Sequence, residues 1–123
     1  MKKIETSNAP AAIGPYTQAY ISGSTLYTSG QIPIDPVTGD IAGTTIVEQA
    51  EQVMKNLGAI LKAAGTSYQK VIKTTCFLAD MKDFAEFNAV YADYFTEKPA
   101  RSCVAVKTLP KNVLCEVELI AEV

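Results

Sequence analysis

Two stretches near the end of the chain alternate between apolar and polar side chains, and this period of two constrains the fold most. Residues 99–106 begin with a proline that favours an extended start, and residues 114–122 repeat the alternation after an intervening turn. We interpret the two stretches as the strands of one antiparallel hairpin whose apolar faces lie over the core. This register predicts that Arg101, Cys103 and Glu116 lie together on the opposite face, because a slip of one residue would expose the core side chains.

The rest of the chain predicts further strands and two amphipathic helices. Thr45 followed by Glu48 is typical of a capping box at a helix start, and Gly65 is typical of a helix end. Apolar side chains recur at helical spacing after both predicted helix starts. The expected helices cover residues 45–64 and 80–95, and the other expected strands cover residues 2–5, 17–22, 25–29 and 71–79.

Residues 1–123 are expected to form a single domain of the α+β class, in which two helices pack on one face of a mixed sheet. The other face is predicted to carry Arg101, Lys73, Thr75, Phe77, Glu116 and Ile120. This set is too charged for a core and too apolar for a face that meets only water. We therefore expect another copy of the chain to cover it, in a closed cyclic homo-oligomer.

Composition excludes several classes of function. The chain has no histidine, which removes Ser-His and Cys-His nucleophile pairs and every metal site that needs an imidazole. A net charge of -2 and the lack of a basic run argue against a nucleic-acid partner. No apolar run approaches membrane-spanning length and no signal peptide is visible. Three cysteines without a Cys-x-x-Cys spacing indicate a reducing, cytoplasmic location.

Arg101 and Glu116 are the strongest candidates for chemistry. A guanidinium matches a carboxylate with two parallel hydrogen bonds, so Arg101 is suited to anchor a small organic acid. Glu116 nearby would act as a base toward a water molecule or an enamine proton. The alternative from spacing alone is a structural ion pair of Arg101 with Glu116 or Glu118.

Five further residues are weaker candidates for a binding role. Tyr16 follows a Gly-Pro pair and is either a packing residue or a lid over a site. Ser29 and Gly30 end a strand, where a glycine lets backbone N–H groups approach a ligand. Asn88 lies near the apolar stripe of the second helix and equally fits a cap or a surface position. Cys103 fits a small spacer better than a nucleophile, because it has no base as a partner.

Several separated motifs make the chain resemble the RidA/YjgF family of enamine/imine deaminases along nearly its whole length. They occur in the same order as in that family. The motifs are Asn8-Ala9-Pro10-Ala11-Ala12-Ile13-Gly14-Pro15-Tyr16, Thr28-Ser29-Gly30-Gln31-Ile32-Pro33, Asp83-Phe84-Ala85 with Asn88, Pro99-Ala100-Arg101-Ser102-Cys103-Val104, Leu109-Pro110-Lys111 and Glu116-Val117-Glu118. The segment between Phe95 and Pro99 looks shorter than in enterobacterial members, and Val117 stands where isoleucine or methionine is usual.

The resemblance implies a chorismate-mutase-like fold and a homotrimer with clefts between subunits. It implies hydrolysis of reactive 2-enamino and 2-imino acids, such as 2-aminoacrylate, to 2-keto acids and ammonia. Arg101 matches the arginine that holds the substrate carboxylate, and Glu116 matches the glutamate that positions the attacking water. Tyr16, Ser29, Gly30, Asn88 and Cys103 match residues that line the cleft. The chemistry implied needs no metal and no organic cofactor, since imines hydrolyse readily once substrate and water are oriented.

Three other functions stay open at this point. A non-catalytic trimer that binds 2-keto acids would use the same residues, and release of ammonia above the spontaneous rate separates it from an enzyme. An endoribonuclease or translation inhibitor would need salt-dependent affinity for RNA, which the acidic composition argues against. A chaperone-like assembly is neither favoured nor disfavoured by the sequence.

Overall fold

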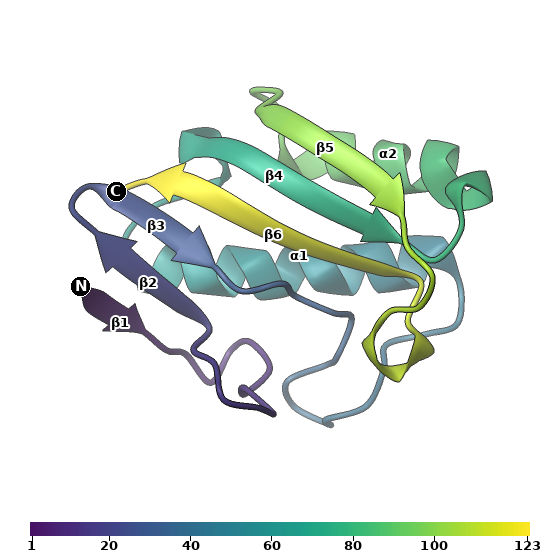
Figure 1. Cartoon of the computed structure of the whole chain (residues 1–123), viewed down its shortest axis with the longest axis horizontal. Helices are drawn as coiled ribbons and strands as arrows, with labels where there is room; N and C mark the ends of the chain where they lie inside the picture. Colours follow the sequence, from purple (N-terminus) through teal and green to yellow (C-terminus); the bar gives the residue numbers. More distant parts are fainter.

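The computed structural model describes all 123 residues, which form one six-stranded sheet covered on one face by two helices (Figure 1). This confirms the predicted α+β class and the placement of both helices on one face. The helices are α1 (Ile46–Ala63) and α2 (Phe84–Tyr94), and three 3₁₀ turns cover Tyr68–Lys70, Met81–Asp83 and Pro110–Asn112. The strands are β1 (Lys2–Ile4), β2 (Ala19–Ser22), β3 (Thr25–Thr28), β4 (Val71–Leu78), β5 (Ala100–Ala105) and β6 (Cys115–Glu122).

The strand order is β1-β2-β3-β6-β4-β5, and it shows that the predicted C-terminal hairpin is wrong. β4 lies between β5 and β6, antiparallel to β6 and parallel to β5 (Figure 1). β5 is therefore an edge strand that never pairs with β6. The cause is the α2 crossover, which returns the chain to the sheet in the direction of β4, as a strand-helix-strand unit requires for a parallel pair. After β5 the chain makes the turn at Pro110–Asn112 and crosses to the other side of β4, where β6 begins.

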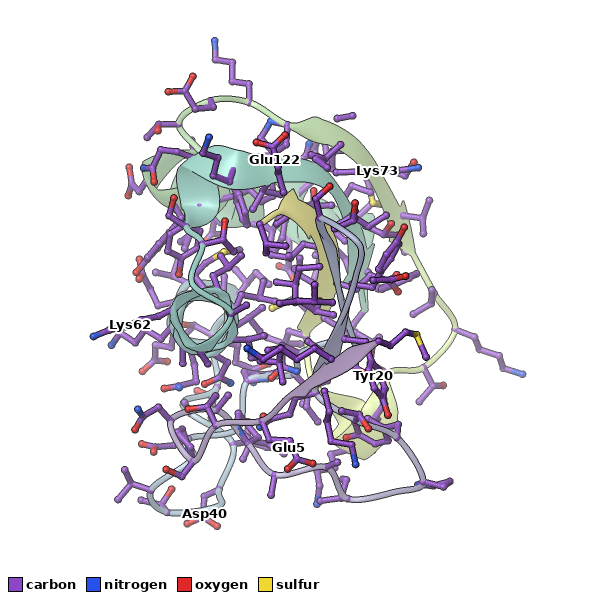
Figure 2. All side chains as sticks on the ribbon, turned by 90° about the vertical axis from the view of Figure 1, so that its left-hand side faces the viewer. Glu5, Tyr20, Asp40, Lys62, Lys73 and Glu122 are labelled. Atoms are coloured by element: carbon purple, nitrogen blue, oxygen red, sulfur yellow. The ribbon has the colours of Figure 1, made fainter.

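The two faces of the sheet differ sharply in character. Inward side chains of β4 and β6 are fully buried against α1 and α2, and they join one apolar core with both helices. On the open face, Lys73 points away from the helices, whereas Lys62 extends from the outer side of α1 (Figure 2). Phe77, Glu116 and Ile120 lie on this open face, half-buried within the single chain, as the alternation predicts. Arg101 does not lie there, which corrects the predicted position of that side chain.

The ends of α1 follow the predicted signals. The Thr45 side chain accepts from the Glu48 N–H, and the Glu48 carboxylate accepts from the Thr45 N–H, so the capping box is complete. Gly65 adopts a φ of 78° after the last turn, where a residue with a Cβ would be strained. No helix has the length and apolar character needed to cross a membrane.

Candidate functional site

The open face of the sheet carries a cavity that brings together four of the predicted site residues. Tyr16, Ser29, Gly30 and Glu116 line a hollow of about 360 Å³. The remaining wall is apolar and comes from side chains that sequence reasoning did not single out. These residues are Ile13, Ile32 and Pro110.

Glu116 lies directly against Gly30, and local strand pairing explains why. Just beyond β3, Gln31 and Val117 exchange two backbone hydrogen bonds of 2.8 and 3.1 Å, which places their neighbours side by side. A Cβ added to Gly30 would lie 2.9 Å from Glu116 Cδ and closer still to its Oε2. A glycine is therefore needed at position 30 to leave room for the carboxylate.

The environment of Glu116 favours its protonated form more than water does. Burial raises the pKa of the Glu116 carboxyl above its usual value, and the like charge of Glu118 on the same strand face raises it further. No cation pairs with Glu116. A carboxyl of raised pKa accepts a proton more readily near neutral pH, which suits a general base.

Gln18 fixes the loop that carries Tyr16 over this cavity. Its buried amide accepts from the Thr6 N–H at 2.7 Å and donates to the carbonyl oxygens of Thr6, Ala9 and Pro10. Tyr16 itself is half-exposed at the cavity rim, a position that fits a lid.

Ser29 also ties this loop to the sheet. Its hydroxyl donates to the Thr17 carbonyl at 2.6 Å, and its N–H donates to the Gln18 carbonyl at 2.9 Å. The serine hydroxyl thus has only acceptor capacity left for a ligand in the cavity.

Arg101 and Asn88 line a second cavity, of about 340 Å³, between the β5 edge and α2. Arg101 Nη1 donates to Asn88 Oδ1 at 2.7 Å, and its Cζ lies 4.7 Å from the ring centroid of Tyr91 and 5.5 Å from that of Phe84. Asn88 therefore contacts the arginine directly.

The guanidinium of Arg101 has no carboxylate partner. The ion pairs of the structure are Lys3 with Glu5 and Lys70 with Glu122, so the predicted alternative of a structural pair with Glu116 or Glu118 is wrong. Arg101 is also the only arginine in the chain. A half-buried guanidinium with unused donors beside a cavity is suited to bind an organic anion.

Cys103 lies on the same side of β5 as Arg101, two residues further along. It is half-buried and packs against the core next to Cys76, its partner in the β4–β5 register. Burial raises the pKa of the Cys103 thiol, even with the positive charge of Arg101 close by. A thiol that stays protonated is a poor nucleophile, which supports the interpretation of Cys103 as a small spacer.

A single chain does not bring Arg101 and Glu116 together. Glu116 points to the open face, whereas Arg101 contacts α2 on the helix-covered side at the sheet edge. The sequence argument that placed both on one face fails because it assumed that β5 pairs with β6. The candidate residues thus fall into two separate groups. We name Tyr16, Ser29, Gly30 and Glu116 the acidic half-site, and Asn88, Arg101 and Cys103 the basic half-site.

Sequence reasoning missed the residues that hold the site side chains in place. Gln18 carries no pattern that marks its role, because its partners are backbone atoms of a loop. Phe84 lies four residues before Asn88 and Tyr91 three residues after it, and this helical spacing was the available signal that all three contact one group. Thr74, which is fully buried and bonds Tyr91, had no sequence signal.

Comparison with known proteins identifies relatives that span the whole chain. The family whose profile matches residues 6–123 is described as Endoribonuclease L-PSP. A Lactococcus lactis protein named as a candidate regulator, AldR, is 57% identical over 100% of this chain and 98% of its own length. A Salmonella typhimurium protein named 2-iminobutanoate/2-iminopropanoate deaminase is 52% identical over 98% of this chain and 96% of its own. The solved structure of Escherichia coli TdcF with bound serine is 47% identical, covers 100% of this chain and 99% of that one, and superposes with a TM-score of 0.96.

Proposed function

Since the chain belongs to the Endoribonuclease L-PSP family, which is the RidA/YjgF family of the sequence resemblance, we propose that it hydrolyses 2-enamino and 2-imino acids to 2-keto acids and ammonia. A relative about half identical bears the name of a deaminase with 2-imino acid substrates. The observation that carries the proposal is the free guanidinium of Arg101 beside a cavity. Every 2-imino acid has the carboxylate that this group recognises.

Arg101 anchors the substrate. Its donors that do not bond Asn88 form two parallel hydrogen bonds with the substrate carboxylate. These two bonds fix the orientation of the substrate, and with it the position of the imine carbon next to the carboxylate. A relative whose solved structure contains bound serine supports a ligand of amino-acid size.

Glu116 activates water. It accepts a proton as the water oxygen bonds the carbon of the protonated imine, and it passes that proton to the nitrogen of the resulting carbinolamine. The C–N bond then breaks, ammonia leaves with the bonding electron pair, and Glu116 takes the remaining hydroxyl proton as the keto group forms. Its raised pKa suits both directions of this transfer. An enamine first gains a proton at carbon to become the imine.

We propose that the two half-sites meet between copies in a homotrimer. The open face carries Phe77, Ile120 and half-exposed Tyr27 and Val104 beside charged side chains, which favours burial against another copy. The acidic half-site of one subunit then faces the basic half-site of its neighbour. Each subunit is proposed as one domain that works in the cytosol, which suits its three free cysteines.

RNA cleavage, which the family description mentions, is not favoured for this chain. The net charge of the chain is -2. Two cationic side chains, Lys98 and Arg101, line the cavity of the basic half-site. Sequence-independent RNA binding needs several phosphate contacts from a basic surface.

The test is a coupled assay with the Arg101→Ala variant. A pyridoxal-phosphate-dependent serine or cysteine lyase generates 2-aminoacrylate, and its disappearance and the release of ammonia are followed with and without the protein. We expect kcat/KM to fall at least about 100-fold in the variant, because two charge-assisted hydrogen bonds of about 1.5–3 kcal/mol each are lost.

Lys62→Ala is the matched control, since it also removes one positive charge but lies on the outer side of α1 (Figure 2). It should match the wild type. Wild-type rates in Arg101→Ala would disprove the assignment of the site. A wild-type protein that binds pyruvate but never exceeds the spontaneous rate would instead identify a non-catalytic binder.

A further inference from the structure

The side of α2 that faces Arg101 presents three side chains in one row. Phe84, Asn88 and Tyr91 are four and then three residues apart, a spacing that places them on one stripe of the helix. Asn88 accepts a hydrogen bond from Arg101, and the rings of Phe84 and Tyr91 lie within cation–π distance of the same guanidinium. The whole row therefore contacts one functional group.

Tyr91 is itself fixed from below. Its hydroxyl oxygen lies 2.7 Å from Thr74 Oγ1 in a buried hydrogen bond. Thr74 has an exposed fraction of 0% and lies directly opposite Arg101 in the parallel β4–β5 register. Burial also raises the pKa of Tyr91, so its hydroxyl stays protonated and able to share this bond.

Aromatic neighbours hold the Tyr91 ring on its other sides. The ring centroid lies 4.5 Å from that of Phe95 and 6.0 Å from that of Phe87, both of which are fully or almost fully buried. These neighbours restrict the ring on the sides that do not face the cavity. The ring offers Arg101 a surface of fixed position.

We propose that Tyr91, anchored by Thr74, is a positioning residue that fixes the guanidinium of Arg101 for recognition of the substrate carboxylate. This inference rests on the proposed function. The rings of Phe84 and Tyr91 lie near the guanidinium and Asn88 takes one donor, while Arg101 also lines the cavity, so its remaining donors are available to a ligand there. An arginine side chain that is free to rotate loses conformational entropy when it binds a ligand, and this loss weakens the affinity. Fixing the side chain beforehand reduces that cost.

The experiment measures pyruvate affinity by NMR titration and 2-aminoacrylate deamination kinetics for Tyr91→Leu, Tyr91→Phe and Thr74→Val. Tyr91→Leu should weaken pyruvate binding about tenfold and raise KM by a similar factor, while kcat changes less than about threefold. Tyr91→Phe keeps the ring but loses the hydrogen bond to Thr74, so it should weaken pyruvate binding about threefold. Thr74→Val keeps the ring but frees it, and should cost about threefold.

A double-mutant cycle separates positioning from a structural role. If Tyr91 acts through Arg101, Tyr91→Leu should cost no further pyruvate affinity in an Arg101→Ala background. A tenfold loss in both backgrounds, or no loss in the wild-type background, would overturn the proposal. If Tyr91→Leu does not fold, Phe84→Leu serves in the same cycle, because the Phe84 ring is half-buried at the helix start.

The titration also keeps the two proposals apart. A wild-type protein that shows Arg101-dependent coupling to Tyr91 in pyruvate binding but releases no ammonia would overturn the proposed reaction and support the positioning role. A protein that deaminates imino acids without any such coupling would overturn the positioning role alone.

Discussion

Gly30 and Glu116 lie so close together that a methyl group added at Gly30 would collide with the carboxylate. The substitution Gly30→Ala therefore tests the acidic half-site. Gly30→Ala would push the carboxylate aside, because the new Cβ meets the far end of a flexible side chain. We expect kcat to fall about tenfold or more, with the free energy of unfolding changed by less than about 1 kcal/mol. Steady-state kinetics and thermal unfolding measure the two effects.

The same substitution has a built-in control. In a Glu116→Gln background, where the base is already absent, Gly30→Ala should add little further loss of kcat. An equal loss in both backgrounds would mean that Gly30 contacts the substrate rather than making room for the base.

If Glu116 is the base, burial sets most of the acidic limit of the reaction through its pKa, and the charge of Glu118 contributes to it. Glu116 must be ionised to activate water, and its raised pKa moves the acidic limb of the kcat/KM profile above the pH expected for an ordinary glutamate. Glu118→Gln removes a like charge that raises this pKa, so the limb should move to lower pH. A pH profile of both proteins measures the shift, and a limb that stays in place would contradict the role of Glu116 as the base.

For single residues, the sequence predicted which side chains of one strand share a face of the sheet, because side chains alternate along a strand. Glu116 lies on the open face as expected, since β6 keeps its period of two throughout. For Arg101 the predicted side of the sheet was wrong, and its role in binding stays a prediction. Its orientation depends on which strand lies beside β5, and alternation within a strand carries no information about neighbours.

Among larger elements, the loop between β1 and β2 depends on one buried amide. Gln18→Met keeps the volume but removes four hydrogen bonds to the loop backbone, so we expect a loss of about 2–4 kcal/mol in the free energy of unfolding. Amide hydrogen exchange should rise in residues 6–16, and KM should rise because Tyr16 loses its fixed position.

Thr45→Ala provides the comparison for Gln18→Met. It removes the capping box of α1 and should cost about 1 kcal/mol, while KM and exchange in residues 6–16 stay as in the wild type. An unchanged KM in Gln18→Met would show that the loop contributes stability alone.

Helices and strands were predictable because their signals are local. The capping box, Gly65 and the alternating strands predict α1 and every strand within two residues of the observed bounds. The second helix was predicted from residue 80, four residues before α2 begins, because a separate 3₁₀ turn at Met81–Asp83 precedes it. Strand order was not local: the hairpin prediction followed sequence proximity, whereas the α2 crossover makes β4 the neighbour of β5. A strand-helix-strand sequence favours a parallel pair, and here this preference decides the neighbour of β5.

At the scale of the whole molecule, mixed assemblies test whether sites form between copies. Arg101→Ala and Glu116→Gln subunits are each expected to be inactive. If each site takes its basic half from one subunit and its acidic half from the next, random equal mixing leaves both halves intact in about a quarter of the sites. Activity should therefore return to about a quarter of the wild-type value after the two variants are dissociated and reassembled together.

Unmixed variants carried through the same procedure are the controls. Reassembled mixtures that stay as inactive as their parents would show that one chain supplies both groups to the same site. Size-exclusion chromatography with light scattering confirms that the mixture has reassembled and gives the number of subunits.

The placement of an acid-binding group and a proton acceptor on opposite sides of one sheet has a cellular consequence. If the sites form between copies as proposed, a newly made subunit holds its two half-sites apart and is inactive until it assembles with other copies. Dilution alone would then switch the reaction off. Activity toward such unstable metabolites would then rise more steeply than the concentration of the protein in the cell. At a low concentration, most subunits would be unassembled and the activity per subunit would be low.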